Sequence, residues 1–220
     1  MKKFRWIIIA LAAGIVLAGC SGGKAVGPEH ATESCVYIDE KGRISSILIA
    51  QYEEADEDLE GLKNFAEDAV IEYNKKKGSA AMSKNVEEAL MRLPVAIQDC
   101  RMEKGTAAVV FEYATAEDLI EFSAEQQDMT VGLTGLETGT VADGLLQGKI
   151  IDGTFISAKN GGEVSPGTVT KKNDNMLVTV YGTGTIRTAK KVVYMTQGVS
   201  SVDDYTVKTP QGKSYIIFKE

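Results

Sequence analysis

The residues with the widest chemical range in this chain are three cysteines and one histidine. Cys20 follows Leu17-Ala-Gly19, Cys35 and Cys100 lie further along the chain, and His30 lies in a Gly-rich stretch. Cysteine acts as a nucleophile or metal ligand when a base or partner ligands are held beside it. A Gly-rich stretch cannot hold an imidazole rigidly, and no two cysteines are close in sequence. We therefore expect a solvated His30 and predict no catalytic residue, no metal and no cofactor.

Cys20 stands at the end of an arrangement that is typical of an export signal. Lys2, Lys3 and Arg5 come first, and the residues from Trp6 to Gly19 are all apolar or small. This stretch is shorter than the roughly 20 apolar residues that a membrane-spanning helix needs. A positive start, a short apolar centre and a small-residue end indicate a signal that is removed during export.

The sequence Leu17-Ala-Gly-Cys20 resembles the lipobox of bacterial lipoproteins. The resemblance implies that residues 1–19 are a signal peptide and that Cys20 carries a diacylglyceryl group. Two acyl chains, at about 0.8 kcal/mol per buried methylene, hold a protein stably on a bilayer. The expected partner at Cys20 is thus the membrane, and the expected location is the extracytoplasmic face of the cell membrane.

The net charge of the chain disfavours some classes of binding partner other than the membrane. It has 24 Lys and Arg against 31 Asp and Glu, a net charge of −7. Residues 1–19 hold basic but no acidic side chains, so their removal leaves a charge of about −10. Such a balance disfavours nucleic acid as a partner. It also provides no attraction to anionic lipid, so attachment to the membrane would depend on the acyl chains.

Cys35 and Cys100 would remain as a pair in an exported chain whose Cys20 is lipidated. Export leads to an oxidising setting in which disulfides persist. A bridge across this loop would stabilise the fold by about 4 kcal/mol on the chain-entropy model. Two separate buried thiols are the alternative, because an even number of cysteines does not establish that they are close together.

Four acidic residues form the candidate metal site of the sequence. Asp56, Asp58, Glu60 and Glu67 partly match the spacing of an EF-hand calcium loop. The match is incomplete, because Glu60 stands where Asp or Asn is usual and Lys63 stands at a position that is usually apolar. Acidic residues are also favoured at a helix N-terminus, which is the interpretation we favour here.

The residues after the signal predict a flexible spacer followed by one domain. Residues 20–33 are Gly-rich and lack apolar periodicity, which predicts a spacer, and the extracytoplasmic domain covers 34–220. Alternation and turn residues predict two hairpins, and apolar spacing of three and four residues predicts helices. The predicted elements are strands at 35–39 and 44–52, a helix at 57–76, a short helix at 83–93, strands at 95–102 and 106–113, and a helix capped by Thr115.

The order of strand, strand and helix occurs twice, which indicates a duplicated unit, or else a chance recurrence of short tripeptides. After a Gly- and Thr-rich loop at 129–148, from which a short helix starts near 138–143, strands and turns dominate. Residues 164–170 are predicted as a strand and Gly182-Thr-Gly184 as a hairpin turn.

The predicted fold class is α+β, with N-terminal strand-strand-helix units followed by an antiparallel, β-rich C-terminal half. Candidate sub-domains cover 34–127 and 150–220.

Short segments carry a wider resemblance, at Val36-Tyr-Ile-Asp39 before Gly42, Phe111-Glu-Tyr-Ala-Thr-Ala-Glu-Asp118, Thr138-Gly-Thr-Val-Ala142 and Ser214-Tyr-Ile-Ile-Phe218. Together they resemble uncharacterised lipoproteins of anaerobic Gram-positive, clostridial-type gut bacteria. The resemblance implies cell-surface attachment and a mixed α and β domain. It provides no catalytic residues.

These observations favour a membrane-anchored, non-enzymatic binding or envelope-associated module. Its expected ligand is a protein, a peptide or a cell-wall component. The alternative is an extracellular hydrolase that uses carboxylates, although no spacing in the sequence marks an acid and base pair. A two-lobed solute-binding protein is less favoured, because about 200 residues are few for two lobes around a cleft.

Overall fold

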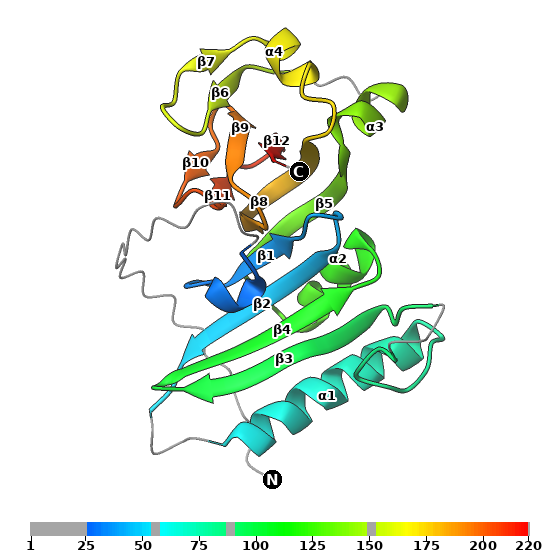
Figure 1. Cartoon of the computed structure of the whole chain (residues 1–220). Coiled ribbons are helices and arrows are strands. Elements are labelled where there is room, and N and C mark those ends of the chain that lie inside the picture. The colour runs from blue at the N-terminus through cyan, green and yellow to red at the C-terminus, as the bar shows by residue number, and fades with distance from the viewer. Residues whose placement is uncertain (1–25, 54–57, 87–90, 149–152, 220) are drawn as a thin grey trace.

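The computed structural model describes residues 26–53, 58–86, 91–148 and 153–219. In these residues twelve strands form one mixed sheet, around which four α-helices pack (Figure 1). The α-helices are α1 (Leu59–Lys76), α2 (Ala116–Glu125), α3 (Val141–Leu146) and α4 (Pro166–Thr170), and a 3-10 helix covers Pro28–His30. The strands are β1 (Cys35–Ile38), β2 (Ile44–Gln51), β3 (Val95–Glu103), β4 (Thr106–Tyr113), β5 (Val131–Thr140), β6 (Phe155–Ser157), β7 (Glu163–Val164), β8 (Met176–Thr188), β9 (Val192–Thr196), β10 (Ser200–Ser201), β11 (Thr206–Thr209) and β12 (Lys213–Phe218).

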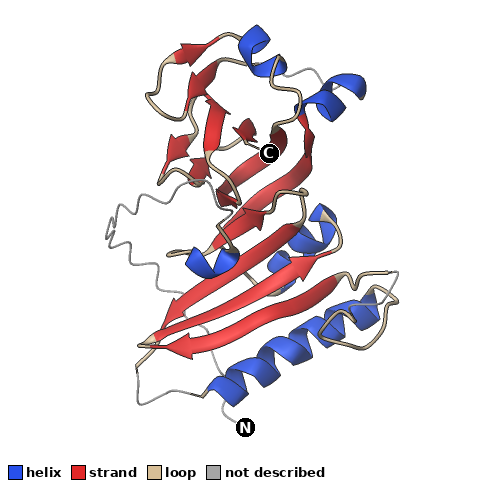
Figure 2. Cartoon of the chain, viewed as in Figure 1, coloured by secondary structure: helices blue, strands red, loops and turns tan. Residues whose placement is uncertain are grey.

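The predicted α+β fold class is wrong, because strand is the dominant secondary structure of the described residues, at 41% against 23% helix, and both halves of the chain share one sheet (Figure 2). The order of the main path is β3-β4-β2-β1-β8-β12-β9-β6-β7. The two halves meet where β1 runs parallel to β8, with Val36 opposite Ile186. This pairing joins residues about 150 positions apart, and no local pattern in a sequence reveals such a partner. The segments 34–127 and 150–220 therefore contribute to a common sheet.

Strand β8 is the centre of the sheet, because each of its edges pairs with two strands. One edge pairs with β5 and then with β1, and the other pairs with β12 and then with β11. Phe218 pairs with Met176 at the start of β8 and with Val192 beyond its end. A straight strand of 13 residues would separate its ends by about 40 Å, so β8 must curve strongly.

Glycine permits this curvature. Gly182 has a φ of +100°, and a Cβ placed there would lie 2.3 Å from the carbonyl oxygen of Gly132 in β5. The predicted hairpin turn at Gly182-Thr-Gly184 is wrong, because these residues lie within β8 and pair with β5. The glycines instead serve a bend and a close approach between two strands.

The main core lies between the N-terminal strands and the helices α1 and α2. Alternation along the strands directs one set of side chains to the helices and the other set to the opposite face. Phe122 of α2 packs its ring against Tyr73 of α1 and Phe111 of β4, with ring centroids 5.4 and 5.2 Å apart. The same core includes Val70, Leu119, Val36, Ile38, Val109, Ile186 and Ile216. It therefore joins side chains from both halves of the chain.

Local signals predicted several elements correctly. The helix predicted at 57–76 is α1, which Asp58 caps by accepting a hydrogen bond from the Gly61 amide at 2.7 Å. The strands predicted at 95–102 and 106–113 are β3 and β4. Thr115 caps α2 by accepting a hydrogen bond from the Asp118 amide at 3.1 Å, as its position before an acidic turn indicates.

Other local predictions are wrong. No helix covers 83–86 or 91–93, and the rest of that predicted helix lies outside the described residues. The Gly- and Thr-rich stretch predicted as a loop from residue 129 forms strand β5, whereas the short helix predicted to start near 138–143 is α3. The strand predicted at 164–170 is mostly α4, which begins at Pro166, a residue that suits the first turn of a helix.

Part of the predicted spacer contacts the domain. The Val26 amide donates to the Ala189 carbonyl at 2.9 Å, and Ala31 packs against Cys35 and its neighbours on β1. Lys208 forms an ion pair with Glu33 at 2.8 Å. Residues 26–33 therefore belong to the fold, whereas residues 20–25 lie outside the described part of the chain.

The turn before β2 yields a prediction about stability. Gly42 has a φ of +75°, and a Cβ there would lie 2.9 Å from the Thr138 Oγ1. Gly78 has nearly the same φ, +74°, but no atom lies within 4 Å of its added Cβ. We expect Gly78→Ala to cost about 1 kcal/mol from backbone strain alone, and Gly42→Ala to cost roughly 1 kcal/mol more. Thermal unfolding measures both, and equal losses would show that the Gly42–Thr138 approach is not restrictive.

Candidate functional site

The structure separates the residues that the sequence suggested for metal binding. Asp58 is the N-cap of α1, and Glu60 and Glu67 lie on the helix that follows, so the predicted loop is a helix from Leu59 onward. Asp56 lies outside the described residues. Across the described ranges, no group of three or more potential ligands could hold a metal ion. The acidic helix N-terminus is the interpretation that fits Asp58.

His30 ends the short 3-10 helix and is exposed, with Nε2 3.3 Å from a Glu29 carboxylate oxygen. Cys20 lies outside the described part of the chain. No helix among the described residues has both the length and the apolar character needed to cross a membrane.

The two remaining cysteines are free and lie on different strands. Cys35 is on β1 and Cys100 on β3, with β2 and β4 between them. Three strand spacings amount to about 14 Å, whereas a disulfide joins Cα atoms that are roughly 4.4–6.8 Å apart. Cys100 also packs against the core under α1 and α2, while Cys35 faces the other side of the sheet. The structure thus has two separate thiols in place of the disulfide considered from the sequence.

The environments of these thiols differ, which predicts a difference in reactivity. Burial raises the pKa of the Cys35 thiol to about 12, although the Arg187 guanidinium acts in the opposite direction. Cys100 is only half-buried, and burial raises its pKa as well. In a Cys20→Ser background at neutral pH, we expect a maleimide to label Cys100 slowly and Cys35 only after unfolding, as measured by mass spectrometry.

The Cys100→Ser variant is the control and should show no labelling of the folded protein. Failure of both cysteines to react after unfolding without a reductant would reveal a disulfide and contradict this arrangement.

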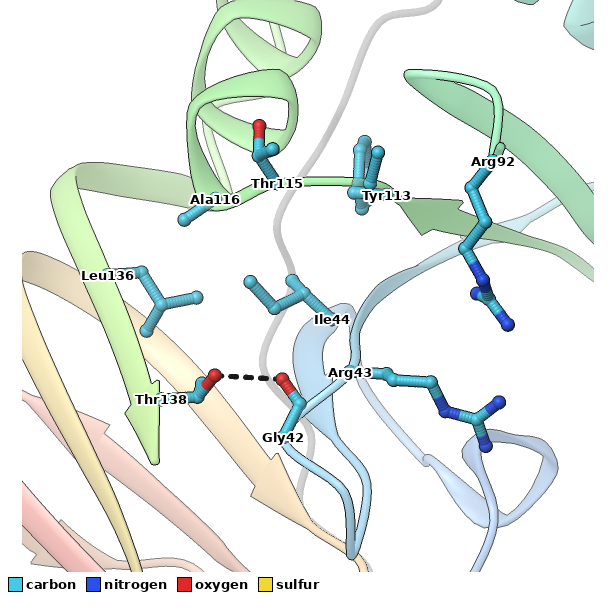
Figure 3. A pocket seen from close by; sticks show the side chains of 10 residues that line it. Gly42, Arg43, Ile44, Arg92, Tyr113, Thr115, Ala116, Leu136 and Thr138 are labelled. Carbon is cyan, nitrogen blue, oxygen red and sulfur yellow. Dashed lines mark hydrogen bonds between the residues drawn. The ribbon is translucent and has the colours of Figure 1, made fainter. Parts of the chain in front are cut away.

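A cavity of about 310 Å³ opens where four separate segments of the chain meet (Figure 3). The turn that leads into β2 provides Gly42, Arg43 and Ile44, and β5 provides Leu136 and Thr138. The remaining wall consists of Arg92 and the connection from β4 into α2, residues 113–116. The Thr138 hydroxyl donates to the Gly42 carbonyl at 2.8 Å and holds β5 against the turn.

One side of this cavity is apolar. Ile44 and Leu136 point toward each other across it, and Ala116 lies beside them (Figure 3). Tyr113 is buried, and its hydroxyl shares a 2.8 Å hydrogen bond with the Ser46 hydroxyl. Burial raises the pKa of Tyr113, so the phenol stays neutral at physiological pH. This side therefore suits a small uncharged group.

Arg43 and Arg92 line the other side of the cavity; the Arg43 side chain extends away from Leu136, and the Arg92 side chain extends toward Arg43 (Figure 3). The Arg43 Nε pairs with Asp39 at 2.5 Å, and the Arg92 Nη1 pairs with Glu112 at 3.2 Å. The side chains are 55% and 46% exposed, so solvent and ligands can reach both guanidinium groups. Guanidinium groups bind carboxylates and phosphates through paired hydrogen bonds.

A second cavity of about 230 Å³ lies beside the first and is lined by Glu40, Asp143 and Asp174. Asp143 accepts hydrogen bonds from the amide and the hydroxyl of Thr140, at 3.1 and 2.7 Å, in the capping box of α3. These bonds hold the pKa of the Asp143 carboxyl below its usual range. A general acid at neutral pH needs a raised pKa, so this carboxylate is suited to capping a helix.

Sequence reasoning missed the arginine-lined cavity. Arg43 belonged to a predicted turn and Arg92 to a predicted helix, and neither position carried a motif. The cavity requires Arg43, Arg92 and Leu136 to come together from parts of the sequence about 45 residues apart. Only the pairing of the strands provides that information.

Comparison with family models, with curated proteins and with solved structures found no match to this chain.

Proposed function

We propose that this chain is a lipid-anchored extracytoplasmic lipoprotein that serves as a non-enzymatic binding module of the cell envelope. The observation that carries the proposal is Leu17-Ala-Gly-Cys20 behind a positive start and a short apolar stretch. The lipid on Cys20 would hold the protein at the membrane, because two acyl chains provide stable attachment.

The start of the fold supports a close attachment to the membrane. Val26 is hydrogen-bonded to Ala189, only six residues after Cys20. Six fully extended residues span about 20 Å. A lipid on Cys20 would therefore keep the end of β8, where Ala189 lies, near the bilayer surface. The domain would then be held by its N-terminus instead of extending into the envelope on a long flexible spacer.

The binding role is supported by the arginine-lined cavity. Its walls come from the turn before β2, the start of α2 and the middle of β5, so the shape depends on the folded state. It combines an apolar side with two solvent-accessible guanidinium groups, as binding sites for small ligands commonly do. A binding module of the envelope needs such a surface, and the cavity meets that need.

The lipid anchor is tested by labelling cells that produce the full chain with an alkyne-bearing fatty acid. We expect wild-type protein to incorporate the label and to fractionate with membranes after a salt wash. Cys20→Ser should incorporate none, because the thiol that accepts the lipid is missing. Gel detection of the coupled alkyne measures the effect, which we expect to be a nearly complete loss.

Cys100→Ser is the matched control, since it removes a different thiol and should retain full labelling. Label on the Cys20→Ser protein, or its absence from the wild type, would contradict lipid attachment at Cys20.

A further inference from the structure

We propose that the cavity between β2, β5 and α2 binds a carboxylate that is flanked by a small apolar group, as at the C-terminus of a short peptide ending in alanine. The inference rests on the proposed binding role and names the class of ligand. It does not depend on the lipid anchor.

The first support is the set of donors that remain on the two arginines. Hydrogen bonds from Arg43 to the described residues use its Nε and its backbone amide, both to Asp39. Among the described residues, Arg92 donates from Nη1 to Glu112. A guanidinium has five N–H donors, so both side chains retain donors for a ligand in a geometry that matches a planar carboxylate.

The acidic partners of the arginines are already engaged by other donors. Asp39 Oδ1 accepts from the backbone amides of Lys41 and Arg43, each at 2.8 Å. Glu112 accepts from the Asn85 side-chain amide at 2.5 Å as well as from Arg92. These carboxylates therefore orient the guanidinium groups without occupying all of their donors.

The start of α2 adds positive potential to the same cavity. Thr115 and Ala116 line it, and Ala116 is the first residue of a helix of 10 residues. The positive end of a helix dipole favours an anion. Glu117 and Asp118 in the first turn oppose this effect in part, and Asp118 accepts hydrogen bonds from Thr115 and from Tyr73 of α1. The helix end supports the arginines and would not suffice as a site alone.

The size and the apolar side of the cavity select the rest of the ligand. A volume of about 310 Å³ lies at the lower end of the range for small-molecule sites, roughly 300–1,000 Å³. Ile44 and Leu136 line the same cavity as the arginines and offer apolar surface on its other side, which suits a methyl group. A phosphate has no apolar part to place there, and its larger charge loses more hydration on binding. A carboxylate beside a methyl group fits both sides of the cavity.

The test uses the full lipidated protein in maltoside micelles and isothermal titration calorimetry. The probes are N-acetyl-Ala-Ala with a free carboxylate, its C-terminal amide, and inorganic phosphate. We expect the acid to bind at least tenfold more tightly than the amide and than phosphate, because only the acid satisfies both sides of the cavity. This comparison on the wild-type protein requires no variant to fold.

The variants then locate the binding site. Arg43→Gln and Arg92→Gln should each weaken binding of the acid about tenfold, since each removes a charge-assisted hydrogen-bond donor. Arg43→Lys should cause a smaller loss, because an ammonium keeps the charge but lacks the fork of donors. Arg101→Gln is the matched control: it removes the same charge from a side chain that contacts Asp99 and the Glu29 carbonyl outside the cavity.

The proposal is overturned if the acid and the amide bind equally, if phosphate binds more tightly, or if the acid gives no binding heat. It is also overturned if Arg101→Gln weakens binding as much as the cavity variants. None of these results affects the fatty-acid labelling of Cys20, so the two proposals can fail separately.

Discussion

The structure depends on one backbone constraint, which is that β8 must satisfy hydrogen bonds along both of its edges while it curves. Buried backbone amides and carbonyls need partners, and β8 finds them in four different strands. Phe218 pairs both with Met176, at the start of β8, and with Val192, which follows the end of β8. A straight β8 would hold these two partners too far apart for one residue to pair with both. Gly182 makes the curve available because its φ of +100° is unfavourable for other residues. The close approach to Gly132 then lets β5 follow the curve.

This constraint also fixes where the chain begins its fold. Because β5 covers only part of one edge of β8, the remaining part is free to accept β1 in parallel. Parallel pairing at Val36 and Ile186 brings the residues before β1 to the end of β8, where Val26 bonds to Ala189. The segment that looked like a spacer in the sequence is consequently held against the domain. Its position follows from strand pairing, which explains why a lack of apolar periodicity was misleading for residues 26–33.

Sequence patterns predicted the parts of the fold whose signals are local. Helix α1 shows apolar spacing and an acidic cap, and the β3–β4 hairpin shows alternation around a Gly turn, so both could be located from neighbouring residues. Strand β5 could not be located in this way, because its glycines and threonines resemble a loop. The glycines are needed in β5 because β8 approaches closely there. For the candidate site, the turn with Gly42 and the cap at Thr115 were visible. The sequence does not show that these two segments lie beside Leu136, because that arrangement requires the long-range pairing of β8.

The arginine-lined cavity is a consequence of the same arrangement. Strand β5 and the β1–β2 hairpin both belong to one edge of β8, but they do not pair with each other in the described residues, and the Thr138–Gly42 hydrogen bond joins them at a single point. Beside this point the two elements remain separated enough to leave the cavity, which the start of α2 closes on a third side. In a chain with a net charge of −7, the overall charge repels anions. Arg43 and Arg92 each pair with one carboxylate, Asp39 and Glu112, so an anion at this opening would be held by directed hydrogen bonds from the remaining guanidinium donors and not by net charge.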